Sequence, residues 1–256
     1  MQTIYTNLQI MDRWTGKTAV VTGASAGIGA ATCVALANAG MTVVGLARRA
    51  HLVHNLKSQL NGKGSLHSKQ CDVSKLEDIT AAFQWVEDTF GGTDVLVNNA
   101  GVFHQGQFTD LGDKMMSDEE IISTIDTNLK AVVFCTRRAL ASMKKRSFDG
   151  HIVNINSIAG HYIPFSSLFN IYPSTKHASC AFTASLLNEL ADFKNKIKVT
   201  SIAPGLVDTA MAEEAAKYFP TLRASDVADA VLYVVSTPPN VNINELSISP
   251  VSEKRL

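Results

Sequence analysis

The sequence predicts an α/β fold in which helices cover both faces of a parallel sheet. Short runs rich in valine and isoleucine alternate with longer amphipathic stretches along the 256 residues. Near-continuous apolar strands that are separated by helices are typical of parallel sheets buried on both faces. No internal repeat or low-complexity linker interrupts this alternation, which indicates one domain.

Seven strands are expected, and most of them are rich in β-branched residues. They fall at residues 17–22, 41–47, 65–71, 94–100, 151–157, 197–205 and 245–249, and the third has the weakest pattern. Helical patterns lie between them at residues 27–40, 51–60, 78–91 and 119–146, from residue 172 onward, and at 226–237. Residues 1–11 are interpreted as an N-terminal extension and residues 12–256 as the single domain.

The composition argues against several classes of protein. Basic and acidic residues number 23 each, and the chain has no long basic run, so a nucleic-acid partner is not expected. No apolar run approaches the roughly 20 residues of a membrane span, and the first ten residues do not resemble a signal peptide. Four scattered cysteines without CxxC spacing are interpreted as buried apolar residues in a reducing compartment, so a cytoplasmic location is expected.

A glycine-rich turn, TGASAGIG at 22–29, follows the first expected strand and opens the first helix. Gly23 allows a tight turn, Gly27 lets the backbone approach a pyrophosphate, and Gly29 permits close helix packing. The N–H groups and the dipole at this helix start favour an anion. A dinucleotide site is therefore predicted, and Ser25 and Ile28 of the same turn are expected to contribute to it.

The end of the second strand bears on which dinucleotide binds. An acidic residue there binds the ribose 2′-hydroxyl of NAD, whereas arginine accommodates the 2′-phosphate of NADP. The sequence has Ala47 at the acidic position, followed by Arg48 and Arg49. The missing acid and the adjacent arginines favour NADP, although two arginines are also compatible with a solvated helix start.

Tyr172 and Lys176, in YPSTK at 172–176, lie four residues apart at the start of an apolar helical pattern. This spacing places both side chains on one helix face, one turn apart. A cation beside a phenol favours the phenolate, so the pKa of Tyr172 is expected to fall below its usual value of about 10. The alternative is an ordinary tyrosine and lysine on a helix surface.

These motifs resemble the classical short-chain dehydrogenase/reductase family, from about Asp12 over nearly the whole chain. The resemblance also includes NNAG at 98–101, Asn128, Ser157 and PG at 204–205, all in the family's order. DRW at 12–14, VGLARR at 44–49, INSIAGH at 155–161 and AVLYVVSTPP at 230–239 resemble an NADP-dependent subgroup. That subgroup contains insect farnesol dehydrogenases and a vertebrate ketosteroid reductase. The resemblance implies a Rossmann fold with strand order 3-2-1-4-5-6-7.

The resemblance also implies catalytic roles for four residues. Tyr172 is expected to protonate the carbonyl oxygen during reduction, and Lys176 to lower the tyrosine pKa and hold the nicotinamide ribose. Ser157 is expected to hydrogen-bond the substrate oxygen. Asn128 is expected to position a water that links Lys176 to solvent. Taken singly, Asn128 is equally compatible with satisfying the backbone, and Ser157 with ending a strand.

Further contacts to NADP(H) follow from the same resemblance. Residues 99–101, which are Asn99, Ala100 and Gly101, are expected along the cofactor, and Asp72 and Val73 beside the adenine. Pro204, Gly205, Val207 and Thr209 complete the expected cofactor set, the last two at the nicotinamide amide. The cofactor supplies the hydride, and the protein supplies orientation and proton transfer.

The segment at 158–171 is rich in aromatic and aliphatic residues, and the segment at 206–222 is short beside a vertebrate member of the subgroup. Together they predict a partly open apolar pocket. A lipophilic alcohol or carbonyl compound is the expected substrate, with an isoprenoid or a steroid as examples. The rival interpretation is a catalytically idle dinucleotide-binding sensor or scaffold. A homodimer or homotetramer is expected, with contacts through the helices that contain Asn128 and Tyr172. The apolar faces of these helices, which include Val132, Val133 and Leu140, are also compatible with packing on the sheet within one subunit.

No metal is expected. His51 and His54 are three residues apart on a predicted helix, but they lack further Cys or His partners and are interpreted as solvated. His161 is expected to face the pocket. Cys180, one turn beyond Lys176, is expected to be packed rather than reactive.

Overall fold

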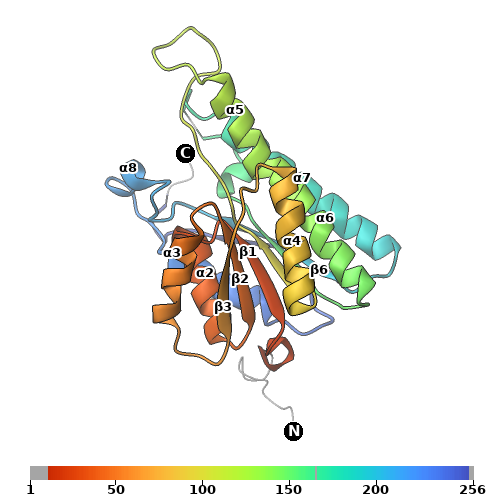
Figure 1. Ribbon diagram of the computed structural model, residues 1–256. Helices are drawn as coiled ribbons and strands as arrows, with labels where there is room; N and C mark the ends of the chain where they lie inside the picture. Colours follow the sequence, from red (N-terminus) through yellow and green to blue (C-terminus); the bar gives the residue numbers. More distant parts are fainter. Residues whose placement is uncertain (1–10, 165, 254–256) are drawn as a thin grey trace.

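The centre of the computed structural model is a seven-stranded parallel sheet, and the structure describes residues 11–164 and 166–253 (Figure 1). The strands are β1 Thr18–Thr22, β2 Thr42–Ala47, β3 Ser65–Gln70, β4 Val95–Asn98, β5 His151–Ile155, β6 Lys198–Pro204 and β7 Glu245–Ile248. Their order, β3-β2-β1-β4-β5-β6-β7, confirms the predicted Rossmann topology, and every neighbouring pair is parallel.

Helices cover both faces of this sheet. One face carries α2 Gly27–Asn38, α3 Ala50–Asn55 and α9 Ala224–Val235, and the other carries α4 Leu76–Phe90, α6 Ala131–Lys145 and α7 Ile171–Asp192. The remaining α-helices are α5 Asp118–Ile125 and the short α8 Glu213–Ala216. Helical 3₁₀ turns lie at Asp12–Trp14, Leu56–Gln59 and Ile158–Gly160. The helix expected at 51–60 is thus α3 continued by a 3₁₀ turn.

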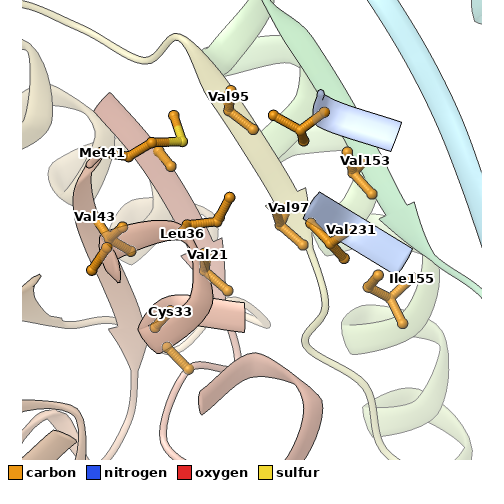
Figure 2. Close-up of a cluster of buried hydrophobic side chains, with 14 of the residues drawn as sticks. Val21, Cys33, Leu36, Met41, Val43, Val95, Val97, Val153, Ile155 and Val231 are labelled. Atoms are coloured by element: carbon orange, nitrogen blue, oxygen red, sulfur yellow. The ribbon is translucent and has the colours of Figure 1, made fainter. Parts of the chain in front are cut away.

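Side chains of successive strand residues enter different cores, because they point to opposite faces of the sheet. Val21, Val97 and Val153 pack against Leu36 of α2 and Val231 of α9 (Figure 2). On the other face, the core includes Val20, Leu96, Ile152 and Val199 of the strands and Ile79, Phe83, Cys135 and Met143 of α4 and α6. Burial on both faces explains why the strands read as continuous apolar runs.

The stretch predicted as helical at 119–146 is helical throughout, and its middle turn is a π turn. It consists of α5, a π-helical turn at Asp126–Lys130, and α6. The helical pattern predicted at 119–146 is confirmed, and the π turn within it could not be read from that pattern. Ser117 starts α5 with a capping box that includes Glu120. The widened turn contains Asn128, one of the predicted site residues.

A polar network inside the protein ties two helices to the sheet. Asn98 of β4 donates hydrogen bonds to Thr136 of α6 (2.9 Å) and to Oδ1 of Asn154 on β5 (2.8 Å). Asn154 in turn donates to Thr183 of α7 (2.9 Å). All four side chains are buried, so each depends on these partners in place of water.

Residues 1–10 of the expected N-terminal extension lie outside the described residues. Met11, the last residue of that extension, packs against the core cluster that contains Trp14. None of the helices in the described ranges is long and apolar enough to span a membrane. Within the same ranges, no group of three or more His, Cys, Asp or Glu side chains is arranged to hold a metal ion.

Candidate active site

Two adjoining cavities lie at the carboxyl ends of the strands, where parallel sheets of this kind bind ligands. The first cavity, of about 560 Å³, is lined by the glycine-rich turn, and the second, of about 620 Å³, is lined by Ser157 and Phe103. Six residues line both: Ile28, Asn156, Tyr172, Thr209, Ala210 and Met211. Tyr172 thus stands where the two cavities meet.

The first cavity gathers most of the predicted dinucleotide contacts. Its lining includes Gly23, Ser25, Gly27, Ile28, Arg48, Arg49, Asp72, Val73, Asn99, Ala100, Gly101, Tyr172, Lys176 and Thr209. Pro204, Gly205 and Val207 line the second cavity instead. Gly29 lines neither, and a Cβ on it would overlap the Gly23 carbonyl oxygen and the Asn99 amide. Gly29 therefore serves the close packing of α2 against the turn, as its position in the motif predicted.

The Thr22 hydroxyl holds the turn against the end of β4, and the sequence reasoning missed this role. Its oxygen accepts hydrogen bonds from the backbone N–H groups of Asn99 and Ala100, each at 3.0 Å, and it donates to the Val97 carbonyl at 3.5 Å. Asn99 completes the link by donating to the Thr22 carbonyl (3.0 Å). A threonine at the end of a strand gives no signal of such contacts, because the partners are more than 70 residues away.

We expect Thr22→Val to destabilise the protein, because valine keeps the shape but leaves two backbone donors without an acceptor. Each unpaired donor costs about 1–3 kcal/mol, so the loss of both should lower Tm by about 4–24 °C for a chain of this size. Thr22→Ser keeps the hydroxyl and should lose less. Thermal unfolding followed by circular dichroism measures both, and equal Tm values for wild type and Thr22→Val would contradict this role.

Positive and negative groups meet at the far end of the first cavity. Arg48 and Arg49 directly follow β2, and their side chains are exposed. Asp72 accepts hydrogen bonds from the Ser74 backbone (3.1 Å) and hydroxyl (2.8 Å). Burial raises the pKa of Asp72, but the Ser74 hydrogen bonds and the charge of Arg48 together leave it below its usual value. Ser74 also lines this cavity and was not predicted.

The tyrosine and lysine of YPSTK lie in the first turns of α7. The Ser157 side chain, which follows β5, lies close enough to the Tyr172 phenol to favour its ionised form. Lys176 is 6 % exposed, and its Nζ lies 5.6 Å from the centroid of the Tyr172 ring. The same Nζ donates to the Ile155 carbonyl at 3.2 Å. Ser157, Tyr172 and Lys176 are therefore assembled as the spacing and the resemblance predicted.

The pKa expected for Tyr172 was wrong in direction. Burial raises it above the ordinary value, and the hydrogen bond with Ser157 opposes this only in part. Burial also lowers the pKa of Lys176 to about 8, and the nearby Cys180 opposes this shift only in part. Loss of water disfavours the charged form of both groups. The sequence spacing indicated the neighbouring cation but not the loss of water around the two groups.

Asn128 lies 1 % exposed in the π turn and lines neither cavity. Its Oδ1 accepts from the Val102 N–H and its Nδ2 donates to the Val102 carbonyl, both at 2.9 Å. Nδ2 also lies 3.3 Å from the Thr175 hydroxyl. Asn128 thus fastens the segment after NNAG to α7, next to Lys176. Its predicted role in positioning a water stays a prediction.

Aromatic and aliphatic side chains form much of the second cavity. Phe103 packs against Tyr172 and Phe169, with ring centroids 5.0 and 4.9 Å apart. The segments at 158–171 and 206–222 both contribute, as predicted, through residues such as Tyr162, Phe169, Leu206 and Val207. Phe103 was missed, since its only sequence signal is its place two residues after NNAG.

His161 does not face either cavity, contrary to expectation. Its Nε2 lies 2.8 Å from Glu245 Oε1 of β7 and 3.9 Å from Cys180 Sγ. The 3₁₀ turn at Ile158–Gly160 redirects the chain after Ser157, which spacing alone does not reveal. Cys180 also takes a hydrogen bond from the Asn156 amide, and burial raises its pKa, in agreement with a packed thiol. The side chains of His51 and His54 are exposed, as predicted.

A family model described as short chain dehydrogenase matches residues 17–218. The chain belongs to this family. Among its relatives, the farnesol dehydrogenase of Aedes aegypti is 51% identical over 248 residues, which cover 95% of this chain and 100% of that protein. Dehydrogenase/reductase SDR family member 11 of Gallus gallus is 40% identical over 258 residues, which cover 95% and 99% of the two chains.

Solved structures of short-chain dehydrogenases share this architecture. The alcohol dehydrogenase of the archaeon Thermococcus sibiricus, complexed with 5-hydroxy-NADP, superposes with a TM-score of 0.81. It is 27% identical in sequence, and the match covers 94% of this chain and 99% of that one. The family and fold predicted from the motifs are therefore confirmed for this short-chain dehydrogenase.

Proposed function

We propose that the protein is an NADP(H)-dependent oxidoreductase that transfers a hydride between the nicotinamide and a lipophilic alcohol or carbonyl compound. The observation that carries this proposal is the position of Tyr172. The residue lines both cavities, has the Ser157 side chain near its phenol, and has the Lys176 ammonium beside its ring. A proton donor at such a junction can serve a substrate on one side and a dinucleotide on the other.

The residues of the first cavity fit a dinucleotide. A Cβ at Gly23 would lie 2.8 Å from the Ala100 Cα, so only glycine leaves the backbone free at this turn. The N-terminus of α2, without a side-chain cap, offers its N–H groups to a pyrophosphate. Asp72 and Val73 would flank the adenine, and Lys176 would hold the nicotinamide ribose. When bound, the cofactor supplies or accepts the hydride.

The chain's own residues would perform proton transfer and orientation. The Tyr172 hydroxyl would give its proton to the carbonyl oxygen, which the Ser157 hydroxyl would hold by a second hydrogen bond. Asn128 would keep α7 and the Val102 segment in place around this pair. The aromatic wall formed by Phe103 and Phe169 would exclude water from the reacting centre.

Arg48 is proposed to select NADP over NAD. Support comes from the absent acid at Ala47, from the exposed guanidinium at the cavity edge, and from the NADP analogue named for the Thermococcus structure. We expect Arg48→Ala to raise the KM for NADPH tenfold to a hundredfold, since a charge-assisted phosphate contact contributes about 1.5–3 kcal/mol. The KM for NADH should hardly change, and Arg137→Ala, on the exposed face of α6, serves as the matched control. Equal losses with both cofactors would refute the assignment.

The proposed substrate class rests on the aromatic wall of the second cavity and on the similarity to a farnesol dehydrogenase. Isoprenoid alcohols and aldehydes fit this wall, and ketosteroids are the alternative suggested by the subgroup. The test is NADPH oxidation and NADP reduction across a panel of lipophilic carbonyls and alcohols. A protein that binds NADPH but turns over no member of the panel would be the idle sensor or scaffold.

Location and assembly are part of the same proposal. The four cysteines are free thiols, which suits a reducing compartment such as the cytoplasm. A homodimer or homotetramer remains proposed from family resemblance. Of the residues expected to support it, Val132 is buried and Leu140 packs against the core of the same subunit. Ile122 and Ile125 of α5 are exposed and offer a different apolar face.

A further inference from the structure

The C-terminal segment returns to the second cavity and places a carboxylate there. After β7, Glu253 N–H donates to the Pro250 carbonyl (3.0 Å) in a turn. Glu253 Oε1 then accepts a hydrogen bond from the N–H of Leu206 (2.9 Å), which lines the same cavity. Glu253 is one of the residues that line this cavity, together with Ser157 and Tyr172.

Gly205 provides the space for this carboxylate. A Cβ at Gly205 would overlap Glu253 Oε2, so no other residue fits here while Glu253 keeps its position. The Gly205 N–H donates to the Ile248 carbonyl at 2.7 Å, which holds the two segments side by side. The glycine of the PG motif and the glutamate 48 positions later therefore form one local structure.

One oxygen of this carboxylate has no compensation. Glu253 Oε2 is buried and has no hydrogen-bond partner among the described residues. Within the same residues, no cation forms an ion pair with Glu253. Glu253 as a whole is half-buried, and a charge at the wall of a cavity acts over a longer range than one on the open surface.

The other charged residues of the second cavity do not offset this charge near Ser157. Glu213 and Glu214 of α8 are exposed, and Glu214 pairs with Lys217 at 2.6 Å. Glu120 lies 3.7 Å from His104. Among the described residues that line the cavity, Lys114 is the one lysine, and it is exposed, so solvent screens its charge.

We propose that Glu253 is a specificity-determining residue that excludes anionic substrates from the second cavity. Its carboxylate repels a ligand carboxylate or phosphate and so restricts the site to uncharged alcohols and carbonyl compounds. This inference rests on the proposed function, which it narrows. Lipophilic acids and phosphorylated lipids that share the hydrocarbon chain of a substrate are rejected by charge rather than by shape.

The test compares ligands that differ in charge but hardly in length. Isothermal titration calorimetry, with and without saturating NADP, measures the binding of 1-octanol and octanoate to the full chain. The proteins are wild type, Glu253→Gln and Glu189→Gln. Glutamine keeps an acceptor for the Leu206 N–H while removing the charge, and Glu189 is an exposed residue of α7 that lines neither cavity. The measurements use the full chain so that Lys254 and Arg255, which follow Glu253 and lie outside the described residues, are present.

Wild type should bind octanoate at least about tenfold more weakly than octanol. In Glu253→Gln, the ratio of the octanoate to the octanol dissociation constant should be about fivefold smaller than in wild type. Glu189→Gln should leave the ratio at the wild-type value. Raising the salt from about 20 to about 500 mM should narrow the wild-type ratio without any substitution, which tests the idea even if Glu253→Gln does not fold. The inference would be overturned if wild type bound octanol and octanoate equally well or bound neither. It would also be overturned if neither Glu253→Gln nor salt changed the ratio of the two dissociation constants.

Turnover separates this inference from the proposed function. Octanal and 8-oxooctanoate are assayed with NADPH alongside the binding measurements. Selective binding of octanol without reduction of octanal would count against the oxidoreductase and leave charge selection standing. Reduction of both aldehydes with equal kcat/KM would count against charge selection and leave the oxidoreductase standing.

Discussion

Replacement of Tyr172 by phenylalanine is expected to lower kcat at least a hundredfold, while NADPH still binds. Phenylalanine retains the ring that packs at 5.0 Å against Phe103 but has no proton to donate. General acid–base catalysis contributes about 10²–10⁴ in rate, which sets the size of the loss. Steady-state reduction of a lipophilic aldehyde measures kcat, and NADPH fluorescence measures cofactor binding in the same samples.

The pH dependence of wild type provides a second measure of this role. Because burial raises the pKa of Tyr172, the phenol keeps its proton at neutral pH, as a donor in reduction must. Alcohol oxidation needs the phenolate, so its rate should rise with pH through the alkaline range. Phe103→Leu, which removes a neighbouring ring but no ionisable group, should keep this profile. If Tyr172→Phe retained more than a few per cent of turnover, the tyrosine would be structural and the mechanism wrong.

Lys176→Met is expected to reduce both kcat and NADPH affinity, without lowering stability at neutral pH. Burial holds the pKa of Lys176 at about 8 in the folded protein, below the ordinary 10.5. Below about pH 8 the ammonium is charged in both states, and the full cost of burying it opposes folding. Between about pH 8 and 10.5 the folded state releases the proton first, so this cost disappears and stability rises with pH.

Methionine fills a similar volume without that charge, so the alkaline rise in Tm should be smaller in Lys176→Met than in wild type. Thermal unfolding between about pH 7 and pH 10 measures this difference, and kcat and NADPH binding are measured at neutral pH. Lys196→Met, at an exposed position, provides the control for loss of a lysine. A variant with wild-type kcat and a lower Tm would indicate a purely structural lysine.

The strands and the glycine turn were predictable because each depends on residues that are close in sequence. Valine and isoleucine runs mark buried parallel strands, and the glycines of TGASAGIG stand where the chain must turn closely. The Tyr172–Lys176 pair was predictable for the same reason, since helix geometry fixes a four-residue spacing.

Contacts across long distances in sequence, and burial itself, were not predictable in this way. The hydrogen bonds of Thr22 join segments more than 70 residues apart. The position of Glu253 depends on its contact with Gly205, which is 48 residues away in sequence. His161 lies against Glu245 because a short 3₁₀ turn redirects the chain after Ser157. The pKa of Tyr172 was predicted in the wrong direction because desolvation depends on everything packed around the phenol.

The hydrogen bond between Asn154 and Thr183 has a mechanical consequence for Tyr172, the proposed proton donor. Apolar contact opposes the separation of two surfaces more strongly than it opposes sliding between them. Packing alone would therefore allow α7 to shift along its axis. The hydrogen bond at Thr183 fixes α7 to the sheet and opposes that movement. Because α7 is a rigid helix, the restraint also acts on Tyr172, about 16 Å away at 1.5 Å per residue. Misplacement of a catalytic group by 1 Å can cost about a hundredfold in rate. In the proposed reaction, this distant buried hydrogen bond would therefore help to keep the Tyr172 phenol at the correct distance from the carbonyl oxygen.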